Sequence, residues 1–243
     1  VAPDLRGFGA SDSTPENYAV KDYADDIADL VRLLNIENYV LIGHSMGGKI
    51  ALCLAARQPK NLQSLILLAP SPPTPEPIKE IERKKLLNAR GNRCVATETV
   101  CKAAGGKLSA EVFARAIDDN LRTSEAAWRA WLELGSLEDI SADVEKINIP
   151  VLIAAGANDE NITAELLECE IVRRVQTARL TVIENATHLL PLEAPDTIAD
   201  LIRREVEENR FRKSDQDTEE IYADAPAANF SRRAFDAVKE KGK

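Results

Sequence analysis

Residues 39–50 read YVLIGHSMGGKI. The first four are apolar and of strand length, and residues 49–57 continue with apolar positions at helical spacing. Between them, residues 43–47 fit the pattern G-x-S-x-G, which at a strand-to-helix junction is typical of a nucleophilic serine. A glycine-rich turn that merely packs a helix on a strand is the alternative. The predicted strand and helix on either side favour the nucleophile.

Ser45 is the predicted nucleophile. The backbone of such a turn is strained and its neighbours must be small, a need that Gly43, Gly47 and Gly48 meet. The helix that follows directs the positive end of its dipole toward the turn. We therefore expect the backbone N–H of Met46 to bind the negative oxygen that develops when a carbonyl group is attacked.

A serine hydroxyl needs a base, and the chain holds two histidines, His44 and His188. His44 directly precedes Ser45, so on a tight turn its side chain should point away from the serine. We expect His44 to be a packed or hydrogen-bonded supporting residue. His188 follows a predicted strand that ends at Ile183, at the carboxyl edge where parallel sheets collect their ligands. His188 is therefore the predicted base.

A carboxylate should orient that base and stabilise its protonated form. Asp159 follows the predicted strand 151–155 by a short loop, and the order Ser45, Asp159, His188 fits the order serine, acid, histidine. Glu160 and Glu184 are the competing acids. Glu160 lies one residue further around the loop, and Glu184 is only four residues before His188, where a solvated or supporting role is expected.

Outward from this centre, strand-length apolar runs alternate with amphipathic helical stretches. The alternation is typical of a doubly wound, mostly parallel sheet with helices on both faces, so the predicted fold class is α/β. The predicted strands are residues 39–42, 65–69, 151–155 and 179–183, and the predicted helices are residues 19–34, 49–57, 163–176 and 195–207.

The alternation breaks where five prolines fall within residues 70–77, a stretch that suits neither a helix nor a central strand. Residues 78–137 then read as helices only, with Ser109 and Ser124 as N-cap candidates. We expect a core of residues 1–70 and 150–208, a helical cap inserted over residues 71–149, and a charged C-terminal tail over residues 209–243.

Composition argues against several classes of protein. The 243 residues carry 31 Lys and Arg against 40 Asp and Glu, a net charge of −9, which disfavours a nucleic-acid partner. No apolar run approaches the roughly 18 residues of a membrane span. Four cysteines without a C-x-x-C pair or a histidine cluster favour free thiols in a reducing compartment. We expect a cytoplasmic protein with no metal and no cofactor, and its oligomeric state stays open.

These segments together resemble the α/β-hydrolase fold superfamily, in the branch with a helical cap that holds esterases, epoxide hydrolases, dehalogenases and C–C hydrolases. Besides residues 43–48, the resemblance includes residues 4–12, DLRGFGASD, which look like the family's D-x-R-G-x-G-x-S segment, and Thr187-His188 followed by Glu193-Ala194-Pro195. Dehalogenases and epoxide hydrolases of this branch use an aspartate nucleophile. Ser45 therefore favours acyl transfer to water.

The resemblance also implies that residues 1–4 correspond to the end of the family's fourth strand. Three strands and the oxyanion loop would then be missing, and we expect a fragment or truncated form of a longer hydrolase. Residues 39–42 would be left as an exposed apolar edge. Only the Met46 N–H would remain as an oxyanion donor, and the loss of one donor costs about 10² to 10³ in rate.

The expected reaction is hydrolysis of a carboxylic ester or lactone of a small molecule through Ser45, His188 and Asp159. Cleavage of a C–C bond in a diketone uses the same three residues and is the first alternative. A non-catalytic, truncated hydrolase that binds small molecules is the second. The predicted cap contains two tryptophans at helical spacing, Trp128 and Trp131. They are candidates for the roof of a pocket over Ser45, and the alternative is that they only pack helices together.

Overall fold

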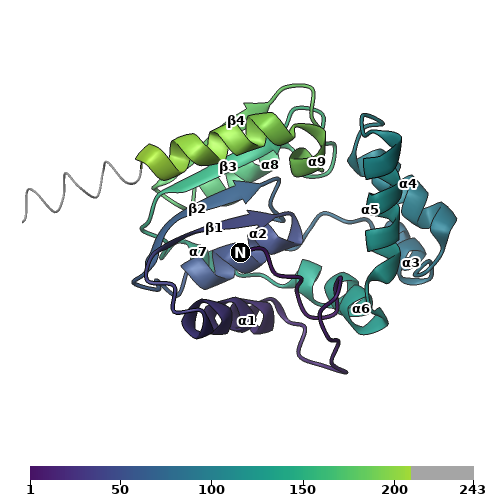
Figure 1. The fold of residues 1–243 in the computed structure, drawn as a ribbon, viewed down its shortest axis with the longest axis horizontal. Coiled ribbons are helices and arrows are strands. Elements are labelled where there is room, and N and C mark those ends of the chain that lie inside the picture. Colours follow the sequence, from purple (N-terminus) through teal and green to yellow (C-terminus); the bar gives the residue numbers. More distant parts are fainter. Residues whose placement is uncertain (209–243) are drawn as a thin grey trace, which may run out of the picture. The chain divides into compact units, whose positions relative to one another are not determined.

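The structure is a computed structural model that describes residues 1–208. By its contacts the chain divides into two units, Val1–Arg203 and Arg204–Lys243. The sheet and the inserted helices belong to the first unit (Figure 1). The residues of the candidate site, Ser45, Asp159 and His188, lie in the same unit. The predicted tail over residues 209–243 lies outside the described residues.

A parallel sheet forms the centre of the first unit. Its described strands lie in the order β1-β2-β3-β4, and every neighbouring pair is parallel. The strands are β1 (Tyr39–His44), β2 (Leu62–Leu68), β3 (Val151–Gly156) and β4 (Ala178–Ile183). The predicted α/β class and parallel sheet are confirmed, and the parallel register brings the carboxyl ends of the strands to one edge.

Helices cover both faces of the sheet, and the alternation of side chains in β2 shows why. Leu65 and Leu67 point into one apolar cluster, which includes Leu52 of the helix after β1. Ile66 and Leu68 point into the opposite cluster, which includes Ile198. The helices of the sheet layer are α1 (Val20–Leu33), α2 (Met46–Ala55), α7 (Ser141–Val144), α8 (Ala164–Leu167), α9 (Leu190–Glu193) and the helical residues 195–203.

The helix predicted for residues 163–176 is present, but it changes type after Leu167 and ends at Val172. Helix α8 ends at Leu167, and Glu168–Val172 continues as a wider π-type turn in which the Arg173 N–H donates to the carbonyl of Glu168. The wider turn still buries Ile171 in the same apolar cluster as Leu167. The apolar spacing was therefore a sound guide to burial but not to the backbone hydrogen bonding.

The helices predicted for residues 78–137 lie between β2 and β3. Ser109 and Ser124 are N-caps as predicted, because their hydroxyls accept from the N–H groups of Val112 and Ala127. These inserted helices are α3 (Glu80–Leu87), α4 (Arg93–Ala103), α5 (Ala110–Arg122) and α6 (Glu125–Glu133), followed by a 3₁₀ turn at Gly135–Leu137.

Lys49 of α2 joins the two connections of the insertion. Its side chain is fully buried, and its ammonium group donates to the carbonyl oxygens of Thr74 on the outgoing connection and Glu138 on the returning one. Burial lowers the pKa of Lys49, and the charges of nearby acids including Glu76 oppose that shift. The two connections are therefore tied to the helix that begins directly after Ser45.

β1 lies at one edge of the described sheet, as predicted. Its side chains are less buried than those of β2 and β3, and Ile42 is 43% exposed. The exposed apolar edge predicted for residues 39–42 is therefore present in this part of the chain.

Candidate active site

Ser45 occupies the turn between β1 and α2 in a strained conformation. Its φ of 52° and ψ of −121° lie in a region that residues other than glycine rarely adopt. The turn is held by the Ser45 N–H, which donates to the carbonyl of Leu68 at 3.1 Å. A Cβ atom at Gly43 would collide with the carbonyl of Gly47, and one at Gly48 would collide with Pro70. The small neighbours predicted for this turn are thus sterically required at these two positions.

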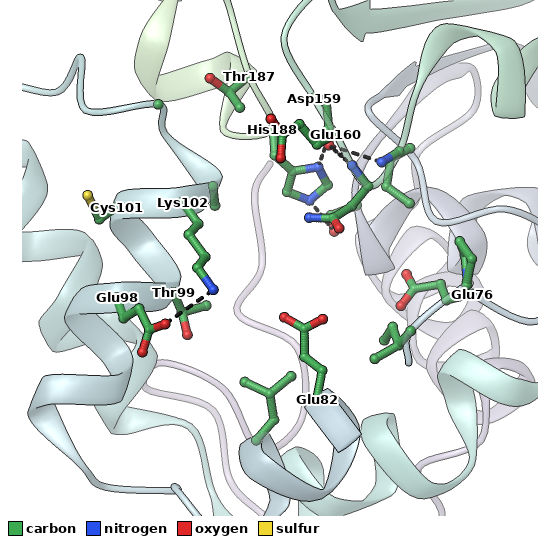
Figure 2. Close-up of a pocket in the computed structure, with 18 of the residues that line it drawn as sticks. Glu76, Glu82, Glu98, Thr99, Cys101, Lys102, Asp159, Glu160, Thr187 and His188 are labelled. Carbon is green, nitrogen blue, oxygen red and sulfur yellow. Dashed lines mark hydrogen bonds and ion pairs between the residues drawn. The ribbon is translucent and has the colours of Figure 1, made fainter. Parts of the chain in front are cut away.

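The structure brings Ser45, His188 and Asp159 into one hydrogen-bonded row. Figure 2 shows the side chains of His188 and Asp159 in this row. The distance from Ser45 Oγ to His188 Nε2 is 2.8 Å, and that from His188 Nδ1 to Asp159 Oδ2 is 2.7 Å. Because a carboxylate only accepts, Nδ1–H donates to Asp159 and Nε2 is free to accept from the serine hydroxyl. The three residues come from the loops after β1, β3 and β4, at the same edge of the sheet.

Asp159 is held in its ionised form. Burial alone would raise its pKa, but the hydrogen bond from His188, the charge of His188 and the N–H groups of Ile162 and Asn161 outweigh burial and lower the pKa. Asp159 Oδ1 accepts from both N–H groups at 3.0 Å, which leaves Oδ2 for His188. The competing acids Glu160 and Glu184 are exposed.

His44 supports the loop that carries His188, as predicted. Its Nε2 lies 2.8 Å from the carbonyl oxygen of His188, so Nε2 carries the proton and donates it. The two imidazole rings are 5.2 Å apart. Burial lowers the pKa of His44 to about 4, and the neighbouring His188 contributes to that shift.

This buried neutral histidine predicts a dependence of stability on pH. In the unfolded chain His44 takes up a proton near pH 6.5, whereas in the folded protein it does so only near pH 4. Its contribution is therefore fully present above pH 6.5 and is lost as the pH falls to 4, by up to about 3 kcal/mol. Urea unfolding of the wild type and His44→Gln at pH 7 and 4.5 measures this.

Glutamine keeps an N–H donor for the carbonyl of His188 but does not titrate. The free energy of unfolding of the wild type should fall relative to that of His44→Gln on acidification, by roughly 2–3 kcal/mol. An equal fall in both proteins would contradict the assignment of a neutral, buried His44.

A cavity of about 760 Å³ lies in front of Ser45 and His188. Its walls come from the core loops, from the proline-rich connection and from the inserted helices α3 and α4, as the close-up shows (Figure 2). The lining from α3 and α4 is Glu82, Lys85, Leu86, Val95, Glu98, Thr99, Cys101, Lys102 and Ala103. The cavity therefore lies between the sheet layer and the inserted helices.

Trp131 lines this cavity, and the structure corrects the expectation for Trp128. The indole N–H of Trp128 donates to the carbonyl of Leu86 at 3.0 Å, which ties its ring to the end of α3 instead of the cavity wall. Met46 is the first residue of α2, so its N–H has no acceptor within the helix. Its role toward a substrate oxygen stays a prediction.

Glu76 is a cavity residue that no sequence pattern predicted. Its carboxylate reaches into the space in front of His188 (Figure 2). Burial raises the pKa of Glu76, while the Ser71 hydroxyl and the charges of Lys49, His188 and Arg83 oppose that shift. Glu76 lies among the prolines of residues 70–77, where no periodic pattern indicates which side chain turns inward.

Residues 1–208 show no metal cluster and no membrane-spanning helix. No group of three or more His, Cys, Asp or Glu side chains in this range is placed to hold a metal ion. No helix there is long and apolar enough to cross a membrane. The four cysteines, all within the described range, are unpaired.

A parallel sheet with serine on the turn after one strand, and an acid and a histidine on later loops, is the arrangement of an α/β hydrolase. A sequence model described as the alpha/beta hydrolase fold matches residues 1–195, and the chain belongs to this family. The relatives named as a hydrolase and an esterase are enzymes, and this similarity supports an enzymatic role for the present chain.

Among curated relatives, 2-(acetamidomethylene)succinate hydrolase of Mesorhizobium japonicum is 28% identical over 211 residues, which cover 81% of this chain and 74% of the relative. An esterase from Exiguobacterium antarcticum superposes with a TM-score of 0.78 at 22% identity, over 84% of this chain and 80% of the esterase, and shows the fold alone. A thermophilic esterase from Thermogutta terrifontis has a TM-score of 0.74 at 26% identity, over 85% and 79% of the two chains.

Proposed function

We propose that this protein is a serine hydrolase that cleaves a carboxylic ester or lactone of a small molecule, with Ser45 as nucleophile, His188 as base and Asp159 as the orienting acid. The observation that carries this is the row of hydrogen bonds from Ser45 through His188 to Asp159, with distances of 2.8 and 2.7 Å. Further support comes from relatives whose names are hydrolase and esterase.

The first half of the reaction forms an acyl-enzyme. Ser45 Oγ attacks the carbonyl carbon while His188 Nε2 takes its proton, and Asp159 stabilises the resulting imidazolium. The carbonyl oxygen becomes negative, and the Met46 N–H at the start of α2 is the proposed donor to it. The tetrahedral intermediate then expels the alcohol, which takes the proton from His188.

The second half repeats these steps with water. His188 removes a proton from a water molecule, whose oxygen attacks the acyl carbon, and the second tetrahedral intermediate expels Ser45 Oγ as it regains a proton from His188. The products are a carboxylic acid and an alcohol, which in a lactone are parts of the same molecule. All proton transfers are accounted for by His188, so no cofactor enters the proposal.

The inserted helices α3–α6 are the proposed cap of the site. Support comes from the cavity residues that α3 and α4 contribute opposite Ser45. A cap in this place would shield the acyl-enzyme from bulk water and shape the pocket for the substrate.

Covalent labelling with a fluorophosphonate tests the proposal directly. The expected result is one phosphonyl group per chain, located on Ser45 by peptide mass spectrometry, with loss of p-nitrophenyl acetate turnover in proportion to labelling. Protein unfolded in urea serves as the control and should not react, because Ser45 then lacks His188. Labelling at a different residue, or full turnover by the labelled protein, would overturn the proposal.

A further inference from the structure

The loop that carries His188 lies between the sheet layer and the inserted helices. The backbone N–H groups of His188 and Leu189 both donate to the carbonyl of Ala103, at 2.9 and 3.2 Å. Ala103 is the last residue of α4. The backbone of the proposed base is therefore hydrogen-bonded directly to an inserted helix.

The side chains next to His188 anchor this loop on both sides. Leu189 packs against the apolar cluster of α4 and α5 that contains Val100 and Ile117. Leu190 is fully buried in the cluster on the sheet, with Ile66 and Leu68. Consecutive residues thus belong to two different apolar clusters, and a shift of the inserted helices relative to the sheet would pull on His188.

The turn between α4 and α5 fits closely against the same loop. Gly105 has a φ of +55°, and a Cβ atom there would overlap the hydroxyl of Thr187, the residue before His188. The ammonium group of Lys107 donates to the carbonyl of Asn185. The neighbouring Gly106 has a φ of +75° but faces open space.

We propose that the α4–α5 turn is a positioning element for His188 through its contacts at Ala103 and Gly105, so that His188 aligns with Ser45 only while the inserted helices are docked on the loop. Gly105 and Leu189 are its positioning residues. This inference rests on the proposed function. It gives the inserted helices a second role, positioning His188, in addition to covering the cavity. Misplacement of a catalytic group by about 1 Å can cost 10²-fold in rate, so a small shift of this turn is enough to matter.

The two adjacent glycines offer a matched experiment. Gly105→Ala and Gly106→Ala both place alanine at positive φ in the same turn, but only the first is pushed against Thr187. Gly105→Ala should lower kcat for p-nitrophenyl acetate by about 10- to 100-fold with little change in KM. Gly106→Ala should keep the wild-type kcat.

A second readout reports on His188 itself. The proton between His188 Nδ1 and Asp159 should give a far-downfield NMR signal in the wild type and Gly106→Ala, and a shifted or weakened signal in Gly105→Ala. The pH profile of kcat/KM should move in the same variant, since the environment of the base has changed. A merely structural role of the turn would leave both readouts unchanged in the folded protein.

Leu189→Ala, with Leu189→Met as the conservative variant, is the second test and covers the case in which Gly105→Ala does not fold. We expect Leu189→Ala to have a lower kcat than the wild type, and Leu189→Met to have a kcat close to that of the wild type. If Gly105→Ala or Leu189→Ala folds and keeps the wild-type kcat, NMR signal and pH profile, the positioning role is overturned. The proposed serine hydrolase function would be unaffected by that result. A wild type without Ser45-dependent turnover would overturn both proposals.

Discussion

Ser45→Ala should lower kcat for p-nitrophenyl acetate by about 10⁶-fold. Without the hydroxyl there is no acyl-enzyme, and His188 has no serine proton to accept. The fold should survive, because the Ser45 side chain makes no helix-capping bond and its hydrogen bond runs to His188. Thermal unfolding followed by circular dichroism checks that survival alongside the kinetics.

The three residues should act as a unit. His188→Ala should be about as damaging as Ser45→Ala, and the double variant should be no slower than either single variant. Additive losses would mean that the two residues work independently, contrary to the 2.8 Å hydrogen bond between them. Turnover by Ser45→Ala above one per cent of the wild-type rate would show that the nucleophile lies elsewhere.

The centre of the fold could be predicted from sequence because its causes are local. The apolar run at β1, the glycines around Ser45 and the apolar face of α2 each act within a few residues. β1 and α2 accordingly begin and end within about three residues of the predicted bounds. The serine N-caps of α5 and α6 could also be predicted, since a cap depends only on the N–H groups of the next turn.

The site residues could be predicted from topology as much as from pattern. Parallel strands end at one edge of a sheet, so residues just after β1, β3 and β4 meet even though they are far apart in sequence. With two histidines in the chain, elimination left one candidate base. The 2.8 and 2.7 Å distances in this row then agree with the predicted order of serine, acid and histidine.

Contacts between separate elements could not be predicted in this way. The hydrogen bond from the His188 N–H to the carbonyl of Ala103 joins a loop to the end of α4, two segments with no shared pattern. The inward turn of Glu76 follows from the path of the proline-rich connection. Trp128 and Trp131 lie on the same helix, yet only Trp131 lines the cavity, because the carbonyl of Leu86 binds the other indole. Each outcome depends on tertiary packing that helical spacing does not encode.

Asp159→Asn should lower kcat by about 10⁴-fold while leaving the fold intact. Oδ2 of Asp159 accepts the Nδ1 proton of His188 at 2.7 Å, which leaves Nε2 unprotonated and able to accept from Ser45. An asparagine can present its NH₂ group to Nδ1, and the imidazole then carries its proton on Nε2. That tautomer cannot take the serine proton, and the imidazolium formed in the reaction loses its counter-charge.

The two competing acids supply the controls. Glu160→Gln and Glu184→Gln remove the same charge and keep nearly the same shape, but both side chains are exposed and neither is hydrogen-bonded to His188 in the described structure. We expect kcat within about threefold of the wild type for both, and the downfield Nδ1 proton signal of His188 to be lost only in Asp159→Asn. If Glu160→Gln or Glu184→Gln caused the large loss and Asp159→Asn did not, the acid would have to be reassigned. A 10⁴-fold loss confined to Asp159→Asn would instead assign the orienting role to the one carboxylate that is buried, ionised and bonded to His188.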